Sequence, residues 1–448
     1  MEACFINPPI QDFYSTSIRR QPLGLLYIMA SLAAAGFKTS FINGHSPRKR
    51  VINMPYEFQY LMKYREHPDP RLSFPFKNYC HFGMSFSEIE QRIRKTDADI
   101  FFIQSQFTPY HQESDRIMDL VKTIKPCARV VTGGCHATLY PEHCLSKAGA
   151  DFVILGEGEE SSVELLRCLD ERGDLSQVPN LAYRNGSRVV STQRRYADDI
   201  DRFPFPVREL LLERDFHVYR RKAAAMITSR GCPNRCGFCT VRVIWGADYR
   251  TRSAGSVVAE IIDCAERFGV TMINFEDDNL FASRDRATVL LEPLVTFRES
   301  SGFRLDLTAM NGVSLEGLDD DIVRLMNRAG FSELNISLMS HSPDLQRRHG
   351  RPFDSIQFAR IAQAARKLGM NVRAYFILGL PGQTIEEVRE TIAFLLDLGV
   401  RVFPSVYYDV LVPPDEWKMQ RSSAFYTETV DMTRDDQVRL FNECRSSW

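Results

Sequence analysis

Three cysteines stand close enough in the sequence to act together. Cys232, Cys236 and Cys239 form a C-x3-C-x2-C pattern in this chain of 448 residues and eleven cysteines, and about 0.007 such patterns are expected by chance at that frequency. Three thiolates this close cannot all form disulfides, and soft metal centres prefer thiolate ligands. The spacing therefore predicts one shared metal site. The other eight cysteines are scattered: Cys4, Cys80, Cys127, Cys135, Cys144, Cys168, Cys264 and Cys444.

The number of cysteines in the pattern separates two kinds of metal centre. A structural zinc ion takes four ligands, but no further Cys or His lies nearby on the C-terminal side, and the nearest upstream candidate is His217. A four-iron cluster held by three cysteines keeps one iron open for another ligand. We therefore expect a [4Fe-4S] cluster at these three cysteines, with zinc as the alternative.

Further polar side chains follow predicted strands. An acidic run, Glu276, Asp277 and Asp278, comes directly after an apolar segment. A solvated turn would also be acidic, but carboxylates on the same rim as the cysteines indicate a functional site. The sequence assigns no catalytic acid, base or nucleophile. The weaker candidates for substrate contact are His341, whose basic surroundings also fit a solvated surface, Tyr407 and Asp409.

The second half of the chain repeats a strand and a helix six times. Several of the predicted helices end at a glycine, and the helix after Gly382 opens with the capping box Thr384-x-x-Glu387. Units of this kind curl into a partial parallel (β/α)6 barrel whose active site lies at the carboxyl ends of its strands. The cysteines follow the first strand, at that end. The predicted strands cover residues 223–228, 272–275, 305–308, 334–338, 372–377 and 402–410.

The first half predicts a doubly wound, Rossmann-like parallel sheet, which binds ligands at the carboxyl ends of its strands. Turn-forming groups stand at those ends, such as Gly133-Gly134 and Gly156-Glu157-Gly158. Asn185-Gly186 predicts a hairpin within the following linker. The expected α/β organisation is 1–170 for the first domain, 171–222 for the linker, 223–412 for the barrel and 413–448 for a short extension. The predicted strands of the first domain cover 3–6, 40–42, 100–103, 130–131 and 152–155.

Composition excludes several classes of protein. The net charge is −1, which argues against a nucleic-acid-coating or polybasic membrane protein. No apolar run approaches the ~18 residues of a membrane span, and the first residues show no secretory signal. An odd number of scattered cysteines does not suggest a disulfide framework. We therefore expect a cytoplasmic globular protein that binds neither nucleic acid nor membrane.

The cysteine pattern, with Phe238 before its last cysteine, resembles the signature of radical S-adenosylmethionine (SAM) enzymes. Two further stretches match in order: Phe275-Glu-Asp-Asp-Asn279 and Gly379-Leu-Pro-Gly-Gln-Thr384. The resemblance implies that the cluster takes an electron from a donor such as flavodoxin or ferredoxin and cleaves SAM. One departure is Met339, where the family often has a glutamate. The residues that the resemblance places around SAM are Phe238, Glu276, Asp277, Asp278, Ser337, Met339, Gly379 and Pro381.

The first half resembles the cobalamin-binding-type domain that precedes many of these enzymes. Glycine turns let the backbone approach a flat macrocycle, although such turns also occur for packing alone. The Asp-x-His-x-x-Gly signature that supplies an axial histidine elsewhere is absent, so His136 is expected to be a wall residue. The residues that the resemblance places at cobalamin are Pro9, Leu25, Gly133, Gly134, His136, Gly156 and Glu157.

Together the two resemblances imply methyl transfer to a carbon of a small molecule, with a [4Fe-4S] cluster, SAM and cobalamin. Met339 motivates an alternative in which SAM is cleaved at another carbon–sulfur bond, for example to transfer its 3-amino-3-carboxypropyl group without cobalamin. A tRNA methylthiotransferase would need more cluster cysteines and a basic appendage. A non-catalytic sensor of cobalamin or the cluster is the remote alternative.

Overall fold

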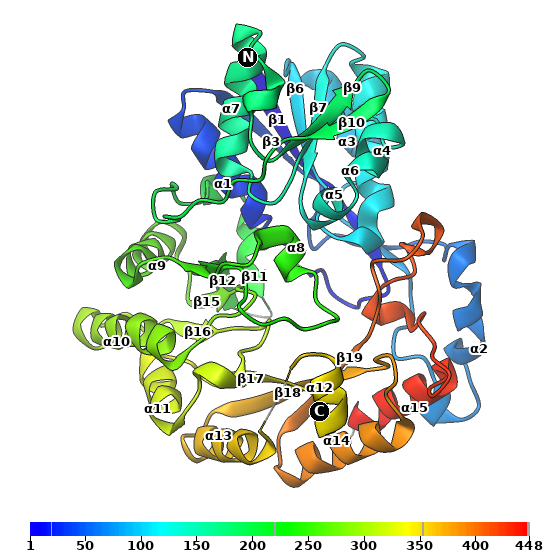
Figure 1. Cartoon of the computed structure of the whole chain (residues 1–448), viewed down its shortest axis with the longest axis vertical. Coiled ribbons are helices and arrows are strands. Elements are labelled where there is room, and N and C mark those ends of the chain that lie inside the picture. Colours follow the sequence, from blue (N-terminus) through cyan, green and yellow to red (C-terminus); the bar gives the residue numbers. More distant parts are fainter. Residues whose placement is uncertain (19, 219–220, 352–353, 446–448) are drawn as a thin grey trace.

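The first sheet has a parallel centre of five strands with helices on both faces. The computed structural model describes residues 1–18, 20–218, 221–351 and 354–445, and Figure 1 shows this sheet above the second half of the chain. Its strand order, β10-β9-β8-β7-β6-β1-β3, confirms the predicted doubly wound arrangement. The parallel strands are β1 (Glu2–Asn7), β3 (Lys38–Asn43), β6 (Ile100–Gln104), β7 (Arg129–Gly133) and β8 (Phe152–Ile154).

Apolar side chains on alternate residues of these strands feed two separate cores, because neighbouring residues of a strand point to opposite faces. Phe5 and Phe102 lie on one face, under helices α1 and α7, whereas Cys4 and Phe101 lie on the other, under α3 and α4. The helices of this half are α1 (Leu23–Ala34), α3 (Phe86–Lys95), α4 (His111–Ile124), α5 (Cys135–Leu139), α6 (Pro141–Ser146) and α7 (Glu159–Glu171).

The predicted hairpin forms and extends the first sheet. Strands β9 (Leu181–Asn185) and β10 (Arg188–Ser191) pair antiparallel around Gly186, whose φ of +62° suits a tight hairpin turn. Strand β9 also pairs with β8, with Phe152 opposite Tyr183. The fully buried Leu181 and Ala182 explain this addition, so part of the expected linker is the edge of the first sheet.

The second half forms the expected partial parallel barrel. Strands β12, β15 and β16 form one group and β17, β18 and β19 another, and the isolated parallel bridges Leu307–Phe331 and Val313–Ile336 join the two groups. The sixth strand ends at Val406 rather than at residue 410. The strands are β12 (Arg221–Met226), β15 (Met272–Phe275), β16 (Asp306–Thr308), β17 (Glu333–Met339), β18 (Asn371–Leu378) and β19 (Arg401–Val406), with β11 (His217–Val218) paired to β12.

Helices cover the outside of the barrel, as Figure 1 shows along its left and lower rim. The expected capping box is present at α14, since Thr384 Oγ1 accepts a hydrogen bond from the Glu387 amide at 3.2 Å and the Glu387 carboxylate accepts one from the Thr384 amide at 2.9 Å. No described helix is long and apolar enough to cross a membrane. The helices are α8 (Val241–Trp245), α9 (Ala254–Phe268), α10 (Arg284–Ser301), α11 (Asp320–Ala329), α12 (Pro343–Arg348), α13 (Ser355–Lys367) and α14 (Ile385–Asp397).

A third layer brings early and late segments of the chain together. The polar, proline-bearing stretch from Pro55 to Lys77 folds into short helices, including α2 (Met62–Arg65), and packs on the C-terminal helix α15 (Arg434–Cys444). Phe74 contacts Phe425 at a ring distance of 5.9 Å. Both segments share the main apolar core with the barrel. The small antiparallel sheet beside them contains β2 (Ile10–Asp12), β4 (Lys49–Val51) and β5 (Cys80–Phe82).

Candidate active site

The three cysteines lie on a loop, residues 231–240, that begins just beyond the carboxyl end of β12. A short antiparallel pair closes the base of this cysteine loop, with Ser229 opposite Thr251 and Arg230 opposite Arg250 in strands β13 (Ser229–Arg230) and β14 (Arg250–Thr251). Gly231 has a φ of +83°, and a Cβ there would lie 2.4 Å from the Asp248 carbonyl oxygen. Only glycine fits this close approach, so the start of the cysteine loop is fixed.

The sulfurs of the cysteine loop are surrounded by groups that suit thiolates. The Asn279 amide lies 3.6 Å from Cys232 Sγ, and the Arg351 guanidinium lies 3.7 Å from Cys236 Sγ. Burial raises the pKa of the Cys239 thiol, and the charges of the other two cysteines raise it further. Within the described ranges no three Cys, His, Asp or Glu side chains converge on one point as metal ligands do. The donor set, three soft thiols with hydrogen-bond donors beside them, nevertheless fits a thiolate-bound cluster.

The acidic run after β15 divides into three different environments. Glu276 accepts hydrogen bonds from the amides of Asn274 and Asn311, the latter at 3.3 Å. Asp277 is buried and ties the ends of β15 and β12 together, because it accepts hydrogen bonds from Thr228 and Ser229. Burial raises the pKa of Asp277.

Asp278 is the member of the acidic run that faces solvent. Its side chain is exposed, but protein surrounds it closely enough that lost hydration, with the neighbouring Asp277 charge, raises its pKa to about 6. Asp278 also acts electrostatically on Cys239. Asp278 thus lies near the cysteine loop, whereas Asp277 has a structural role and connects the ends of two strands.

Met339 lies at a strained point at the end of β17. Its φ is +69°, a region that bulky residues rarely adopt, and the β17–β18 register shifts between Ser337 and Met339. The Met339 side chain is buried against Leu345 and Leu380, with Phe238 and Tyr407 packed on the same group. The structure therefore brings Ser337, Met339, Tyr407 and the aromatic residue of the cysteine loop into one region. Backbone strain of this kind is typical of functional sites.

The glycine turn after β18 is held by a buried glutamine. Gly379 has a φ of +90°, and the amides of Gly379 and Leu380 donate to Gln383 Oε1 at 2.7 and 3.2 Å. His349, which packs on Phe238 with a ring distance of 6.0 Å, lies 3.3 Å from the Pro381 carbonyl oxygen. Through His349, the turn that contains Gly379 and Pro381 thus lies beside the cysteine loop.

The weaker substrate candidates separate in the structure. His341 stacks on Phe394 of α14 at 4.2 Å and contacts Ser355 of α13, so its ring is held among the outer helices rather than beside the cysteines. Tyr407 faces the Met339 group, and burial raises its pKa. The Asp409 amide donates to Gln420 at 2.9 Å, and the Asp409 carboxylate acts on Tyr407.

One glycine turn and a buried proline lie at the carboxyl end of the strands of the first sheet. Gly134 has a φ of +116°, and a Cβ there would lie 2.7 Å from the Ser105 carbonyl oxygen. At Gly133 a Cβ would meet the Ile154 carbonyl oxygen at 3.4 Å. Pro9 is buried beyond the end of β1. The cavity lined by Lys122, Arg129 and Asp151, about 500 Å³, lies at the opposite, amino end of β7 and β8.

His136 lies in a cluster of aromatic rings from two parts of the chain. Its ring lies 4.8 Å from that of Trp417 and 5.4 Å from that of Tyr140, with His111 and His143 on the other sides. His136 is fully buried, and its Nε2 has no hydrogen-bond partner among the residues that the structure describes. Burial lowers its pKa to about 2, so the imidazole is neutral.

Two residues predicted at cobalamin have other surroundings. Leu25 packs in the apolar core under α1, because α1 buries it against the sheet. The Glu157 carboxylate forms ion pairs with Arg250 and Arg230 and accepts a hydrogen bond from the Ala197 amide. These surroundings do not support a side-chain contact with cobalamin at either position.

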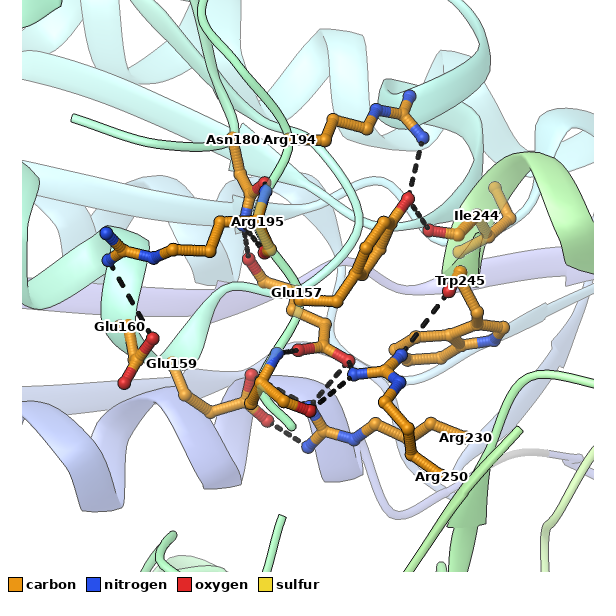
Figure 2. A network of polar contacts seen from close by, with 12 residues as sticks. Glu157, Glu159, Glu160, Asn180, Arg194, Arg195, Arg230, Ile244, Trp245 and Arg250 are labelled. Atoms are coloured by element: carbon orange, nitrogen blue, oxygen red, sulfur yellow. Dashed lines mark hydrogen bonds and ion pairs between the residues drawn. The ribbon is translucent and has the colours of Figure 1, made fainter. Parts of the chain in front are cut away.

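Sequence reasoning missed the residues that bind the two halves together. Arg230, Arg250 and Glu159 are buried at the junction, and Figure 2 shows them around Glu157. In the sequence, Glu159 is visible as the second glutamate of Gly-Glu-Gly-Glu, and Arg230 stands two residues before the first cysteine. The sequence does not indicate that these two residues form an ion pair. Asn279 and Arg351 were missed for the same reason, since their distance to the sulfurs depends on the fold.

Comparison with known proteins agrees with both halves of the structure. The radical SAM superfamily matches residues 226–395, and the B12-binding domain matches residues 79–166. The chain is 24% identical over 416 residues to cytidylyl-2-hydroxyethylphosphonate methyltransferase of Streptomyces wedmorensis, covering 84% of this chain and 73% of that protein. It is 27% identical over 319 residues to an uncharacterised methyltransferase of Pyrococcus horikoshii, covering 71% and 68%.

Solved structures show the same fold. The radical SAM methyltransferase TsrM of Kitasatospora setae, with cobalamin and a [4Fe-4S] cluster bound, matches with a TM-score of 0.69 at 18% identity over 90% of this chain and 74% of that one. The cobalamin-dependent SAM radical enzyme OxsB matches with a TM-score of 0.69 at 16% identity over 94% and 55%.

The fold and the two domain matches define a B12-binding domain followed by a radical SAM domain. The chain is therefore a radical SAM enzyme of the class with an N-terminal cobalamin-binding-type domain, which confirms the resemblance and the predicted fold. The cofactors of this class are a [4Fe-4S] cluster, SAM and cobalamin. The methyltransferase relatives indicate a transferase enzyme rather than the non-catalytic alternative.

Proposed function

We propose that this enzyme transfers a methyl group to a carbon atom of a small molecule with the help of cobalamin. One observation carries the proposal: helix α8, which directly follows the cysteine loop, lies against the Gly156 turn of the B12-binding domain. Gly156 approaches Ile244 of α8, so that a Cβ on Gly156 would lie 2.8 Å from the Ile244 carbonyl oxygen. The sites for the two cofactors therefore share one interface. The relatives named as methyltransferases support the reaction type.

The cysteine loop would bind the cluster, and the strand ends around it would form the SAM site together with Phe238 of that loop. Cys232, Cys236 and Cys239 would hold the cluster, with Asn279 and Arg351 stabilising the negative sulfurs. The SAM site would be formed by Phe238, Glu276, Asp278, Ser337, Met339, Gly379 and Pro381, with Asp277 fixing the strand ends beneath. When bound, these groups supply one-electron and methyl-transfer chemistry, while the protein positions them and excludes water.

The cobalamin site would lie between the two halves. Pro9, Gly133, Gly134 and Gly156 would let the backbone approach the cofactor, with the neutral His136 as a wall. The proposed domains remain 1–170, 171–222, 223–412 and 413–448, with β9 and β10 attached to the first sheet. We propose flavodoxin or ferredoxin as the electron donor. We also propose the cytoplasm as the location, since none of the eleven cysteines forms a disulfide.

The inside of the barrel indicates what kind of substrate would fit. Leu334, Ile336 and Leu338 of β17 pack in the apolar core, so the alternate residues Glu333, Asn335 and Ser337 face the other way, into the barrel. The same alternation holds in β18, where Val372, Ala374, Phe376 and Leu378 join the core. The lumen-facing residues of the two strands are Glu333, Asn335, Ser337, Arg373, Tyr375 and Ile377.

The polar residues of the lumen form a connected group with one open acceptor. Thr308 and Asn335 donate to Glu333 at 2.7 and 3.1 Å, and Arg373 pairs with Glu333 at 3.2 Å. Asn335 is buried, and its Oδ1 has no hydrogen-bond partner among the described residues. A buried orphan acceptor is costly, so this lumen suits a polar substrate that donates a hydrogen bond.

We expect Asn335→Leu to raise the KM of the substrate about tenfold, the equivalent of one lost hydrogen bond, with a smaller effect on kcat. The change removes the orphan acceptor but keeps the size of the side chain. Steady-state kinetics of the reconstituted enzyme would measure it, with His341→Leu as the matched control on the outer helices. An unchanged KM would argue against substrate binding in the lumen.

Product analysis tests the reaction itself. The enzyme, reconstituted anaerobically with its cluster and cobalamin, would be given SAM, a reductant and candidate substrates. S-Adenosylhomocysteine together with 5′-deoxyadenosine would support methyl transfer to carbon. Methylthioadenosine would instead support transfer of the 3-amino-3-carboxypropyl group, the alternative that Met339 favours because its apolar side chain fills the place of a carboxylate.

A further inference from the structure

One turn of the B12-binding domain reaches into the base of the cysteine loop. This coupling turn, residues 156–159, follows β8 and leads into α7. Glu159 pairs with Arg230, which stands two residues before Cys232. Glu157 pairs with Arg250, which lies opposite Arg230 in the β13–β14 pair, and also lies 3.4 Å from Arg230. Figure 2 shows both arginines pointing at these carboxylates.

The same region also holds the far end of the cysteine loop. Helix α8 follows that loop directly, and its Ile244 carbonyl approaches Gly156 of the coupling turn. Arg250 donates to the Trp245 carbonyl at 3.3 Å, and Arg194 donates to the Val243 carbonyl. The near end of the cysteine loop is therefore paired with the coupling turn, and α8 at the far end packs against the same turn and accepts a hydrogen bond from Arg194 of the linker (Figure 2).

The attachment is buried and balanced in charge. Two carboxylates meet two guanidinium groups, and all four side chains are at most 9% exposed. Aromatic rings cover the arginines, with Trp245 5.6 Å from Arg230 and Tyr196 5.1 Å from Arg250. Removing one partner would leave an uncompensated buried charge, so the coupling turn and the cysteine loop must move together.

We infer that the coupling turn links the occupancy of the cobalamin site to that of the cluster site, so that each cofactor increases the affinity for the other. The inference rests on the proposed function, because Gly156 belongs to the proposed cobalamin wall. Because the buried pairs make the turn and the cysteine loop move together, a cofactor that fixes the position of one also fixes the other and lowers the ordering cost for the second cofactor. Such coupling is reciprocal and commonly changes affinity about 5- to 150-fold.

Cobalamin titration tests the link without measuring activity. The full-length protein would be titrated with hydroxocobalamin under anaerobic conditions, once with its reconstituted cluster and once without iron, and binding followed by the visible spectrum of the cobalamin. We expect the cluster to tighten binding at least fivefold in the wild type. Glu159→Gln should reduce that ratio to about one while still binding both cofactors.

A neighbouring glutamate provides the matched control. Glu160 is the second residue of α7 and pairs with Arg202 and Arg195 on the surface, so Glu160→Gln should keep the wild-type ratio. Arg230→Lys keeps the charge and loses the two-pronged geometry, and it would replace Glu159→Gln if that variant failed to fold.

The outcomes separate the inference from the proposed function. Equal cobalamin affinity with and without the cluster in the wild type would overturn the link and leave the reaction intact. The link would also be overturned if the cluster tightened cobalamin binding as much in Glu159→Gln as in Glu160→Gln. Where Arg230→Lys replaces Glu159→Gln, the same effect of the cluster as in the wild type would overturn it. A wild type that binds no cobalamin in either state would overturn the proposed function itself, and the link with it.

Discussion

At the scale of single residues, Asn279 and Arg351 show how the barrel prepares the cysteine sulfurs. Each brings a hydrogen-bond donor to one cysteine, at 3.6 Å from Cys232 and 3.7 Å from Cys236. Donors to sulfur stabilise the thiolate and tune a bound metal centre. Neither residue belongs to the cysteine pattern, so a variant at either one tests the surroundings rather than the ligands.

Asn279→Leu should weaken iron binding about 10- to 100-fold, as the loss of an outer partner commonly does. Leucine keeps the size of the side chain but donates no hydrogen bond to Cys232. Iron retained after graded exposure to a chelator would measure the effect. Asn442→Leu, which removes an amide that donates to Ser73 on the far side of the barrel, is the control and should retain iron as the wild type does.

A buried glutamate should make the stability depend on pH. Burial raises the pKa of Glu113 from 4.5 to about 7, partly offset by Arg421. Between these values the folded chain holds a proton that the unfolded chain has lost, so this residue lowers the free energy of unfolding as pH rises from 4.5 to 7. The difference corresponds to about 3 kcal/mol.

Glu113→Gln should therefore be more stable than the wild type at pH 8 and gain little at pH 4.5. Urea unfolding at both values would measure the difference between the two proteins. The comparison isolates this residue, because the buried histidines act in the opposite direction in both proteins. Exposed Glu171→Gln is the control. A gain of the same size at both pH values would contradict the prediction.

At the scale of elements, the ends of the strands determine the site. Sequence patterning located all six barrel strands, because their apolar faces are continuous, and it predicted which ends carry the cysteines and glycine turns. It did not predict which side chains reach across to another element. Glu157 looked like a cofactor contact but pairs with Arg250, 93 residues later. His341 follows a strand but turns to α14.

Gly156 and Gly186 have similar backbone angles, so alanine variants of the two distinguish the cost of backbone strain from the cost of a steric clash. Gly156 has a φ of +72° and faces Ile244, whereas Gly186 has a φ of +62° with nothing within 4 Å of its Cβ position. Gly186→Ala should lose about 1 kcal/mol from the left-handed conformation alone. Gly156→Ala should lose more, because its new methyl group collides with the α8 carbonyl. Equal losses in denaturant unfolding would mean that the turn and α8 are not packed together.

At the scale of the whole molecule, Arg421 joins the C-terminal segment to the beginning of the chain. It is buried, donates to the carbonyl oxygens of Gln11 and Pro109 at 2.7 and 2.6 Å, and lies 3.3 Å from the carboxylate of Asp12. Ser423 donates to the same carboxylate at 2.5 Å. The first and last segments of the chain are therefore held by one buried charge pair.

Arg421→Ala should lower the free energy of unfolding by about 3–5 kcal/mol, because it leaves Asp12 buried without its cation. Urea or thermal unfolding would measure the loss. Arg347→Ala, at an exposed pair with Asp344, should cost less than about 1 kcal/mol. Similar losses in the two variants would mean that the two ends of the chain are not held by this pair.

The shared core of early and late segments also bears on how the chain is made. Phe58 and Tyr64 lie in one apolar cluster with Phe425 and Phe441, which a ribosome adds more than 300 residues later. At ~10 residues per second, roughly half a minute separates the two pairs. Phe58 packs on Phe13 and Tyr79 early, but the cover from the two late rings is missing through that interval, and apolar surface exposed in this way is prone to aggregation.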